Sequence, residues 1–360
     1  MNVLFVSGHP AHVHNFKLVK NELEERGHNV YWLAKDKEVS RQLLQTYKIN
    51  YELLKKPGKS IISKIYVFIG NTLFSINYLK KNNIDVVVSR LSPYLAIASY
   101  IMRKSHITLT DTETAGFYDR IFSKFVSVVL TSYSFKNNIH PKQIRYNANT
   151  ELFYLHPNRF NNTDNIENIL GINTKTPFVL MRFVSWNAYH DKGLSGFSDA
   201  NKIKVVEMFS KYARIFISSE KDLPPQLEKY RVQISPDKIH YVIKNAALLF
   251  GESATMASES AVLGTPAIYL NKNWLGYIEE EADYGLVFTF KDSEEDQKNA
   301  INKGVELLND PSVKEKIKKS RFKFIENKID VTAFLAWFIE KYPVSQRRME
   351  NDPDYQYNFK

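Results

Sequence analysis

The chain has 360 residues, of which 44% are hydrophobic and 13% aromatic, and its formal net charge is +10. This length predicts two domains of ordinary size, each with its own apolar core. The sequence contains no cysteine, which excludes disulfide bonds and thiolate metal or redox sites. The positive charge suits phosphorylated substrates or an anionic membrane surface. A nucleic-acid partner is not expected, because no basic run with interleaved aromatic residues occurs.

The N-terminal part alternates strands with helices. A buried strand is predicted at Val3–Ser7, a helix follows that ends at Gly27, and a second strand is predicted at Val30–Ala34. The first apolar run is too short for a signal peptide and no basic region precedes it, so we expect a cytoplasmic protein. A strand, a helix and a strand with short links indicate a right-handed parallel unit, in which ligands bind beyond the carboxyl ends of the strands.

Three histidines follow directly after the first predicted strand, namely His9, His12 and His14. No nearby carboxylate or cysteine completes a ligand set, so no metal site is predicted. A neutral imidazole at a helix start suits a general base, because the helix dipole lowers its pKa, and we assign this role to His12. The alternative is a helix cap or a packing residue, and we prefer that alternative for His9 and His14.

A long apolar helix is predicted from about Ser60 to Lys81. Lys64, Asn71 and Asn77 interrupt it, so it is too polar for a transmembrane span. Such a helix most often packs one face against a core. Its apolar face could also rest on an anionic membrane, as a peripheral contact at the inner face. The flanking lysines are Lys55, Lys56, Lys59, Lys80 and Lys81.

A polar cluster, Asp111-Thr112-Glu113-Thr114, follows the strand predicted at Ile107–Thr110. It lies just past a strand end, where it could line a ligand site or simply cap the next helix. Asp111 and Glu113 are therefore further candidates for the catalytic base.

The alternating pattern restarts after the most polar stretch of the middle of the chain, Asn158–Asn165. We place the domain boundary there, with a first domain over 1–160, a second over 174–342 and a polar tail over 343–360. The second domain begins with a buried strand at Phe178–Phe183. Two successive strand–helix runs of similar size indicate two Rossmann-like α/β domains with parallel sheets and a cleft between them.

The most informative stretch is Ala247–Leu270. A short buried strand ends at Gly251, and a helix capped by Ser253 or Thr255 runs to Gly264. The free N–H groups and the positive dipole end of this helix form an anion site, and the small residues Gly251, Ser253 and Ala254 let a phosphate approach the backbone. Glu259, one turn further along, is placed to accept hydrogen bonds from a ribose. The alternative is an ordinary capped strand-to-helix connection.

Four phrases of the sequence carry a resemblance, namely His9–His14, Lys142–Asn147, Arg182–Asn187 and Gly251–Tyr269. By these phrases, and over nearly its whole length, the chain resembles an uncharacterised bacterial and archaeal family, the domain of unknown function numbered 354. More distantly it is similar to GT-B glycosyltransferases and to non-hydrolysing UDP-N-acetylglucosamine 2-epimerases. That similarity implies a GT-B-like fold, with two Rossmann-like domains whose parallel sheets face a central cleft.

The resemblance also implies site residues. It places the base of the donor near Ile239 and His240, and the ribose at Glu259. It places the diphosphate at Ser253, Ala254 and Thr255. It likens His12 to the histidine that ends the first glycine-rich loop of the GT-B enzyme acting on the lipid-linked peptidoglycan precursor, although this chain has only Gly8 there. The set of acidic and histidine residues that marks the epimerases is not found. The complete candidate donor-binding set is Arg182, Ser185, Ile239, His240, Ser253, Ala254, Thr255 and Glu259.

The expected function is that of a metal-independent glycosyltransferase. It would move a sugar from a nucleotide diphosphate, UDP-linked by resemblance, to a glycan or lipid-linked acceptor in surface polysaccharide synthesis. No cofactor is expected. The alternatives are an epimerase acting on the nucleotide sugar itself and a non-catalytic nucleotide-sugar-binding protein.

Overall fold

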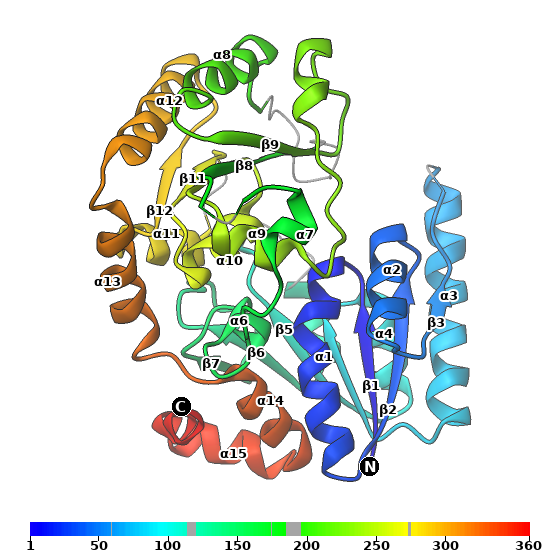
Figure 1. The fold of residues 1–360 in the computed structure, drawn as a ribbon. Coiled ribbons are helices and arrows are strands. Elements are labelled where there is room, and N and C mark those ends of the chain that lie inside the picture. The colour runs from blue at the N-terminus through cyan, green and yellow to red at the C-terminus, as the bar shows by residue number, and fades with distance from the viewer. Residues whose placement is uncertain (59, 114–119, 174, 185–195, 273–274) are drawn as a thin grey trace. The chain divides into compact units, whose positions relative to one another are not determined.

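A computed structural model of the protein describes residues 1–58, 60–113, 120–173, 175–184, 196–272 and 275–360. The chain forms two compact units, each built around one parallel sheet (Figure 1). Unit 1 combines Met1–Asn158 with Lys328–Lys360, and unit 2 is Arg159–Asn327. The prediction of two α/β parallel-sheet units is confirmed.

Unit 1 contains a seven-stranded parallel sheet in the order β3-β2-β1-β4-β5-β6-β7. Its strands are β1 (Asn2–Ser7), β2 (Asn29–Lys35), β3 (Glu52–Leu54), β4 (Val86–Arg90), β5 (Ser105–Thr110), β6 (Val128–Ser132) and β7 (Gln143–Tyr146). In β1, Val3 is in register with Val30 of β2 on one side and Val86 of β4 on the other. The β1 side chains from Val3 to Ser7 are buried, as expected for a parallel strand that is covered on both faces.

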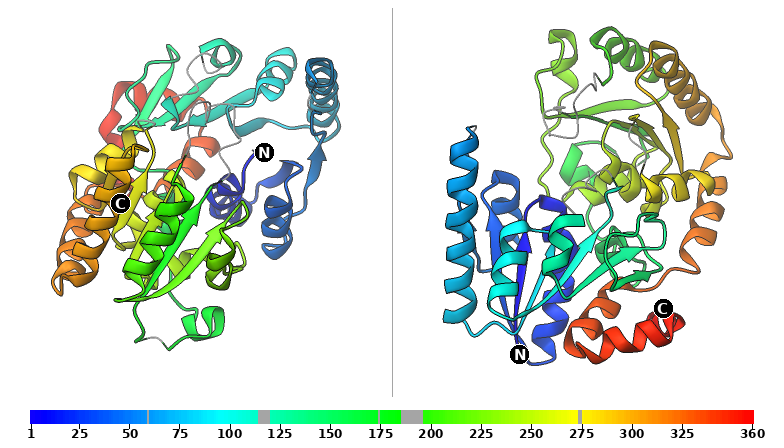
Figure 2. Two further views of the ribbon diagram at one scale, coloured as in Figure 1. Left: turned by 90° about the horizontal axis from the view of Figure 1, so that it is seen from above. Right: turned by 180° about the vertical axis from the view of Figure 1, so that it is seen from behind.

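The helices of unit 1 form two packed groups on opposite faces of this sheet (Figures 1 and 2). One group holds α3 (Ile61–Lys81) and α4 (Pro93–Ile101). The other holds α1 (Pro10–Glu25), α2 (Glu38–Thr46), α6 (Leu152–Leu155) and α14 (Val331–Glu340). In the described part of the chain no helix combines the length and apolarity needed to cross a membrane, including α3, the longest at 21 residues.

The C-terminal segment corrects the predicted domain limits. Helix α14 was expected to close the second domain, but it packs against α1 in unit 1, where Phe334, Leu335 and Phe338 are fully buried. The predicted loose tail instead forms α15 (Val344–Asn351) and the 3₁₀ helix η5 (Pro353–Phe359), drawn red in Figures 1 and 2. Gln356 fixes this segment, because its Oε1 accepts the N–H of Asn147 at 2.6 Å.

Unit 2 contains a five-stranded parallel sheet in the order β12-β11-β10-β8-β9. Its strands are β8 (Phe178–Phe183), β9 (Arg214–Ser219), β10 (Leu248–Gly251), β11 (Ala267–Leu270) and β12 (Val287–Phe290). Its helices are α7 (Ile166–Leu170), α8 (Asp199–Phe209), α9 (Ile239–Asn245), α10 (Ala254–Leu263), α11 (Gly276–Asp283), α12 (Glu294–Asn309) and α13 (Val313–Ile325). In its core, Phe250 of β10 makes edge-to-face contacts with Phe197 and Phe209, with ring centroids 5.3 and 5.5 Å apart.

Candidate functional site

The start of α10 brings the three predicted diphosphate-binding residues together at the carboxyl end of β10. Ser253 is the N-cap, and its hydroxyl accepts the N–H of Met256 at 3.3 Å. Ser253, Ala254 and Thr255 are all partly exposed. The N–H groups of Ala254 and Thr255 precede the first hydrogen bond within the helix, so the helix itself supplies them no acceptor. This end of α10 can therefore donate to an anion, with the helix dipole adding to the attraction.

Gly251 has a different role from the one that the sequence suggested. A Cβ built on it would lie 2.2 Å from the carbonyl oxygen of Arg182, which is its register partner on β8. No side chain fits in that space, so the glycine is required by the close approach of two neighbouring strands. The sequence suggested that Gly251 is small in order to admit a phosphate. The structure gives a different reason, which is the close pairing of β10 with β8.

The residues predicted to contact the base and the ribose of a donor also contact each other. The Nε2 atom of His240 lies 2.9 Å from Oε1 of Glu259, and each residue is only 4% exposed. His240 comes from the short helix α9, and Ile239, which is partly exposed, is the first residue of that helix. The orientation of the Glu259 carboxylate is therefore set by a side chain from a neighbouring helix.

Arg182 lies at the end of β8 and is tied to the end of β9. Its guanidinium donates to Oγ of Ser218 at 2.8 Å and forms an ion pair with Glu220. Ser185, the other candidate from this part of the sequence, lies outside the described residues. The Arg182 side chain is 21% exposed.

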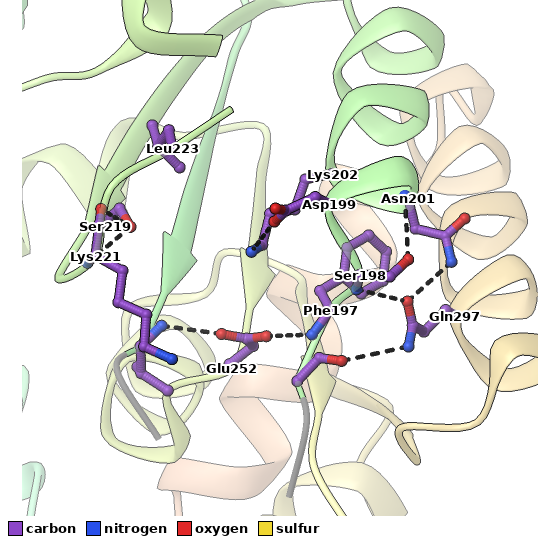
Figure 3. Close-up of polar contacts among 12 residues, drawn as sticks. Phe197, Ser198, Asp199, Asn201, Lys202, Ser219, Lys221, Leu223, Glu252 and Gln297 are labelled. Carbon is purple, nitrogen blue, oxygen red and sulfur yellow. Dashed lines mark hydrogen bonds and ion pairs between the residues drawn. The ribbon is translucent and has the colours of Figure 1, made fainter. Parts of the chain in front are cut away.

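Glu252 is a site residue that the sequence analysis missed (Figure 3). It is 4% exposed and lies between the end of β10 and the cap of α10. Its Oε2 accepts the N–H of Val184 at 2.9 Å, and its Oε1 accepts the N–H of Phe197 at 2.5 Å. One buried carboxylate thus joins Val184 and Phe197 to the start of α10. The only sequence signal was an acidic residue in a short link otherwise made of small residues.

A second polar group holds the chain directly after this point (Figure 3). Oε1 of Gln297, on α12, accepts the N–H of Ser198 at 3.1 Å and the side-chain amide of Asn201 at 2.9 Å. The side-chain amide of Gln297 donates to the carbonyl of Gly196 at 3.3 Å. The start of α8 is therefore fixed to α12. Glu252 binds the backbone of Phe197, and Gln297 binds the backbone of its two neighbours, Gly196 and Ser198.

In unit 1, His12 lies in the first turn of α1. Its Nδ1 accepts the N–H of Gly8 at 3.1 Å, so the proton of the neutral ring is on Nε2. Burial, and next the positive charge of Arg90, hold the pKa of His12 well below its ordinary value. His12 is therefore a neutral imidazole whose Nε2 donates, whereas a general base must accept a proton there.

The other two histidines have local roles. Nδ1 of His9 accepts the N–H of Ala11 at 3.3 Å, which makes His9 the N-cap of α1. His14 is buried, with its ring centroid 5.2 Å from that of Tyr154. The preferred alternatives for these two residues, a cap and a packing position, agree with this geometry.

Asp111 is held by three partners at the end of β5. It forms an ion pair with Arg90, its Oδ1 accepts the hydroxyl of Thr112 at 3.0 Å, and its Oδ2 accepts the hydroxyl of Thr150 at 2.9 Å. Arg90 thus joins two candidates, since it binds Asp111 and lowers the pKa of His12. Glu113 lies two residues further on, and its carbonyl accepts the side-chain amide of Asn137 at 3.3 Å. Among the described residues, no group of three histidine or acidic side chains is arranged to hold a metal ion.

The profile of the family DUF354, described as "Protein of unknown function", matches residues 4–330. The chain belongs to this family. No curated protein matches its sequence. Among solved structures, it is similar to a UDP-GlcNAc 2-epimerase from Neisseria meningitidis bound to UDP-GlcNAc, with 15% identity, a TM-score of 0.68, and coverage of 95% of this chain and 100% of the other.

Two further structures show the same fold. The S. aureus MnaA–UDP co-structure has 11% identity and a TM-score of 0.66, and the match covers 100% of this chain and 97% of the MnaA chain. MurG from Acinetobacter baumannii has 15% identity and a TM-score of 0.58, with coverage of 94% and 99%. The family therefore shares the GT-B fold of glycosyltransferases and of UDP-GlcNAc 2-epimerases.

Proposed function

We propose that the protein is a metal-independent GT-B-type glycosyltransferase. It moves a sugar from a nucleotide diphosphate, UDP-linked, to a glycan or lipid-linked acceptor in surface polysaccharide synthesis. The observation that carries the proposal is the start of α10, where a capped helix presents N–H groups at the carboxyl end of a parallel strand. The structures of MnaA with UDP and of the Neisseria epimerase with UDP-GlcNAc support a nucleotide-sugar ligand for this fold.

On the donor side, the diphosphate would bind at Ser253, Ala254 and Thr255. The amides and the dipole of α10 would stabilise the charge that develops on the leaving diphosphate, which is the largest electrostatic demand of the transfer. The ribose would bind the Glu259 carboxylate, which His240 orients. Ile239, Arg182 and Ser185 complete the proposed donor side.

On the acceptor side, the transfer needs a group that takes the hydroxyl proton. The acceptor oxygen forms a bond to the anomeric carbon, the bond from that carbon to the diphosphate oxygen breaks, and the diphosphate leaves with the electron pair. His12 can accept the proton at Nε2 only as the other tautomer, which gives up the hydrogen bond from Gly8. Asp111 and Glu113 are the alternative bases, and Asp111 forms an ion pair with Arg90.

An epimerase of the UDP-N-acetylglucosamine type is the second candidate. It is favoured by the higher similarity of two UDP-GlcNAc 2-epimerase structures, with TM-scores of 0.68 and 0.66 against 0.58 for MurG. It would need acid and base groups on both faces of one sugar, within a single bound nucleotide sugar.

Product analysis separates these functions. The purified protein is incubated with UDP sugars, with and without a lipid-linked glycan acceptor, and free UDP and sugar configuration are measured. We expect UDP release that depends on the acceptor. Epimerised sugar without any acceptor would establish the second candidate instead. Binding of the donor with no consumption under either condition would identify a nucleotide-sugar-binding protein.

A further inference from the structure

Helix α3 of unit 1 carries an apolar surface that faces away from its own core. Six large side chains along this helix are between 52% and 77% exposed. They are Ile61, Ile62, Ile65, Tyr66, Ile69 and Leu73. Scattered exposed hydrophobic residues are normal, but a contiguous apolar patch marks an interaction surface.

The six side chains share one face of the helix. At 100° per residue, they project within a sector of roughly 140°. The other side of α3 is buried at Val67, Asn71, Ser75 and Tyr78. Tyr78 packs there with apolar residues of the sheet and of α4. In Figures 1 and 2, α3 lies at the outer edge of unit 1 on the β3 side. The exposed face is therefore additional to the face that holds the helix in the fold.

The segment that carries this apolar face contains basic residues and no acidic ones. Between Glu52 and Asp85 the sequence contains no aspartate or glutamate. The same segment contains the lysines Lys55, Lys56, Lys59, Lys64, Lys80 and Lys81. A run of this composition carries only positive charge beside its apolar side chains.

The N-terminal lysines are held beside the helix. The side chain of Asn71, which is 4% exposed, accepts the N–H of Lys55 at 3.0 Å and donates to the carbonyl of Lys55 at 3.0 Å. The N–H of Gly58 donates to the hydroxyl of Ser63 at 2.8 Å, which fixes the approach to the helix. Lys55, Lys56 and Lys64 are exposed, so α3 and the link that leads into it combine exposed positive charges with exposed apolar side chains.

We propose that the outer face of α3 docks on an anionic lipid bilayer, with the helix lying in the interfacial layer. An apolar face inserts below the headgroups, while neighbouring lysines bind the negative surface. A second copy of this chain is a poorer occupant, because pairing two α3 faces would bring two all-lysine segments together with no acid on either. The proposal does not depend on the proposed transferase activity, and it would place the protein where lipid-linked acceptors are found.

Vesicle sedimentation of the full-length protein tests it. Vesicles of phosphatidylcholine with phosphatidylglycerol should retain the protein, vesicles of phosphatidylcholine alone should retain much less, and added salt should release it. Replacing Ile62, Ile65 and Ile69 together by serine should weaken binding at least ~10-fold, since all three side chains are inserted. Replacing Lys55, Lys56 and Lys64 by glutamine should weaken it ~5-fold per lysine.

The matched control is Phe322→Ser, which removes a side chain that is 68% exposed on α13 of unit 2. It should bind vesicles as the parent does. Because all the replaced side chains are exposed, melting temperatures should stay close to that of the parent, and the lysine variant provides an independent test if the isoleucine variant misfolds. The proposal would be overturned if the parent showed no preference for the anionic vesicles. It would also be overturned if both α3 variants bound the vesicles as tightly as the parent does. A parent dimer that the isoleucine variant dissociates, without vesicle binding, would assign the face to a second copy.

Discussion

The carboxylate of Glu252 should be essential for the stability of unit 2 around the end of β8. It accepts two backbone N–H groups, from Val184 and Phe197, and it is almost completely buried. In Glu252→Gln, one oxygen can still accept one of these groups, but the NH₂ faces the other donor. We therefore expect the loss of one hydrogen bond to a charged acceptor, ~1.5–3 kcal/mol, and one buried N–H left unsatisfied, ~1–3 kcal/mol. The variant should unfold with a free energy roughly 3–5 kcal/mol lower than the parent.

Two measurements test this expectation. Urea unfolding followed by circular dichroism reports the change in midpoint, and hydrogen exchange read by mass spectrometry reports the amides of Val184 and Phe197 directly. Both amides should be protected in the parent and exchange much faster in the variant. The control is Glu207→Gln, an exposed position in the last turn of α8. Unchanged exchange at both amides together with an unchanged midpoint would refute the role given to Glu252.

Three other changes have defined outcomes. Glu259→Gln should weaken UDP binding by ~1.5–3 kcal/mol in calorimetry while melting near the parent, because the amide can still pair with His240. His12→Asn should lower single-turnover transfer ~10²–10⁴-fold with little loss of stability, since its oxygen can still accept the Gly8 N–H. Burial lowers the pKa of His106 to about 3, so the unfolded chain binds more protons below about pH 6.5. Stability should therefore fall by about 2 kcal/mol from roughly pH 7 to roughly pH 5, and His106→Gln should flatten this slope.

Each of these expectations can fail in a distinct way. Unchanged UDP affinity in Glu259→Gln would leave the His240 pair as a purely structural contact. Normal turnover in His12→Asn would leave Asp111 and Glu113 as the remaining bases. An equal pH dependence in parent and His106→Gln would show that other groups control acid stability.

The sequence was most informative where local signals agree. The predicted helix that starts after Ser253 and ends at Gly264 is observed as α10, with Gly264 in the left-handed region at a φ of 81°. Capping, dipole and turn chemistry act over a few residues, so they can be read along the chain. The parallel sheets also followed from short apolar runs alternating with helical patterns.

What the sequence could not supply was long-range packing. Nothing local in Val331–Glu340 distinguishes a helix that packs on α1 from one that closes the preceding domain, since both need the same apolar face. The pairing of His240 with Glu259 is also long-range packing, because it joins residues of two different helices that lie 19 positions apart in the chain. Glu252 was missed because a buried carboxylate with backbone partners has the same sequence appearance as an exposed one.

Each unit has a helix that starts at the carboxyl end of a parallel strand, α1 after β1 in unit 1 and α10 after β10 in unit 2, but the two helix starts differ in what occupies their N–H groups. At α1, Pro10 has no N–H, Ala11 donates to His9, and the preceding Gly8 donates to His12. Side chains of unit 1 thus occupy the donors that an anion would need. At α10 the cap takes only the N–H of Met256, which leaves the donors of the first two helical positions directed outward. A diphosphate would therefore gain more from the helix start of unit 2. For this reason the donor is assigned to unit 2, although both units share the same strand–helix arrangement.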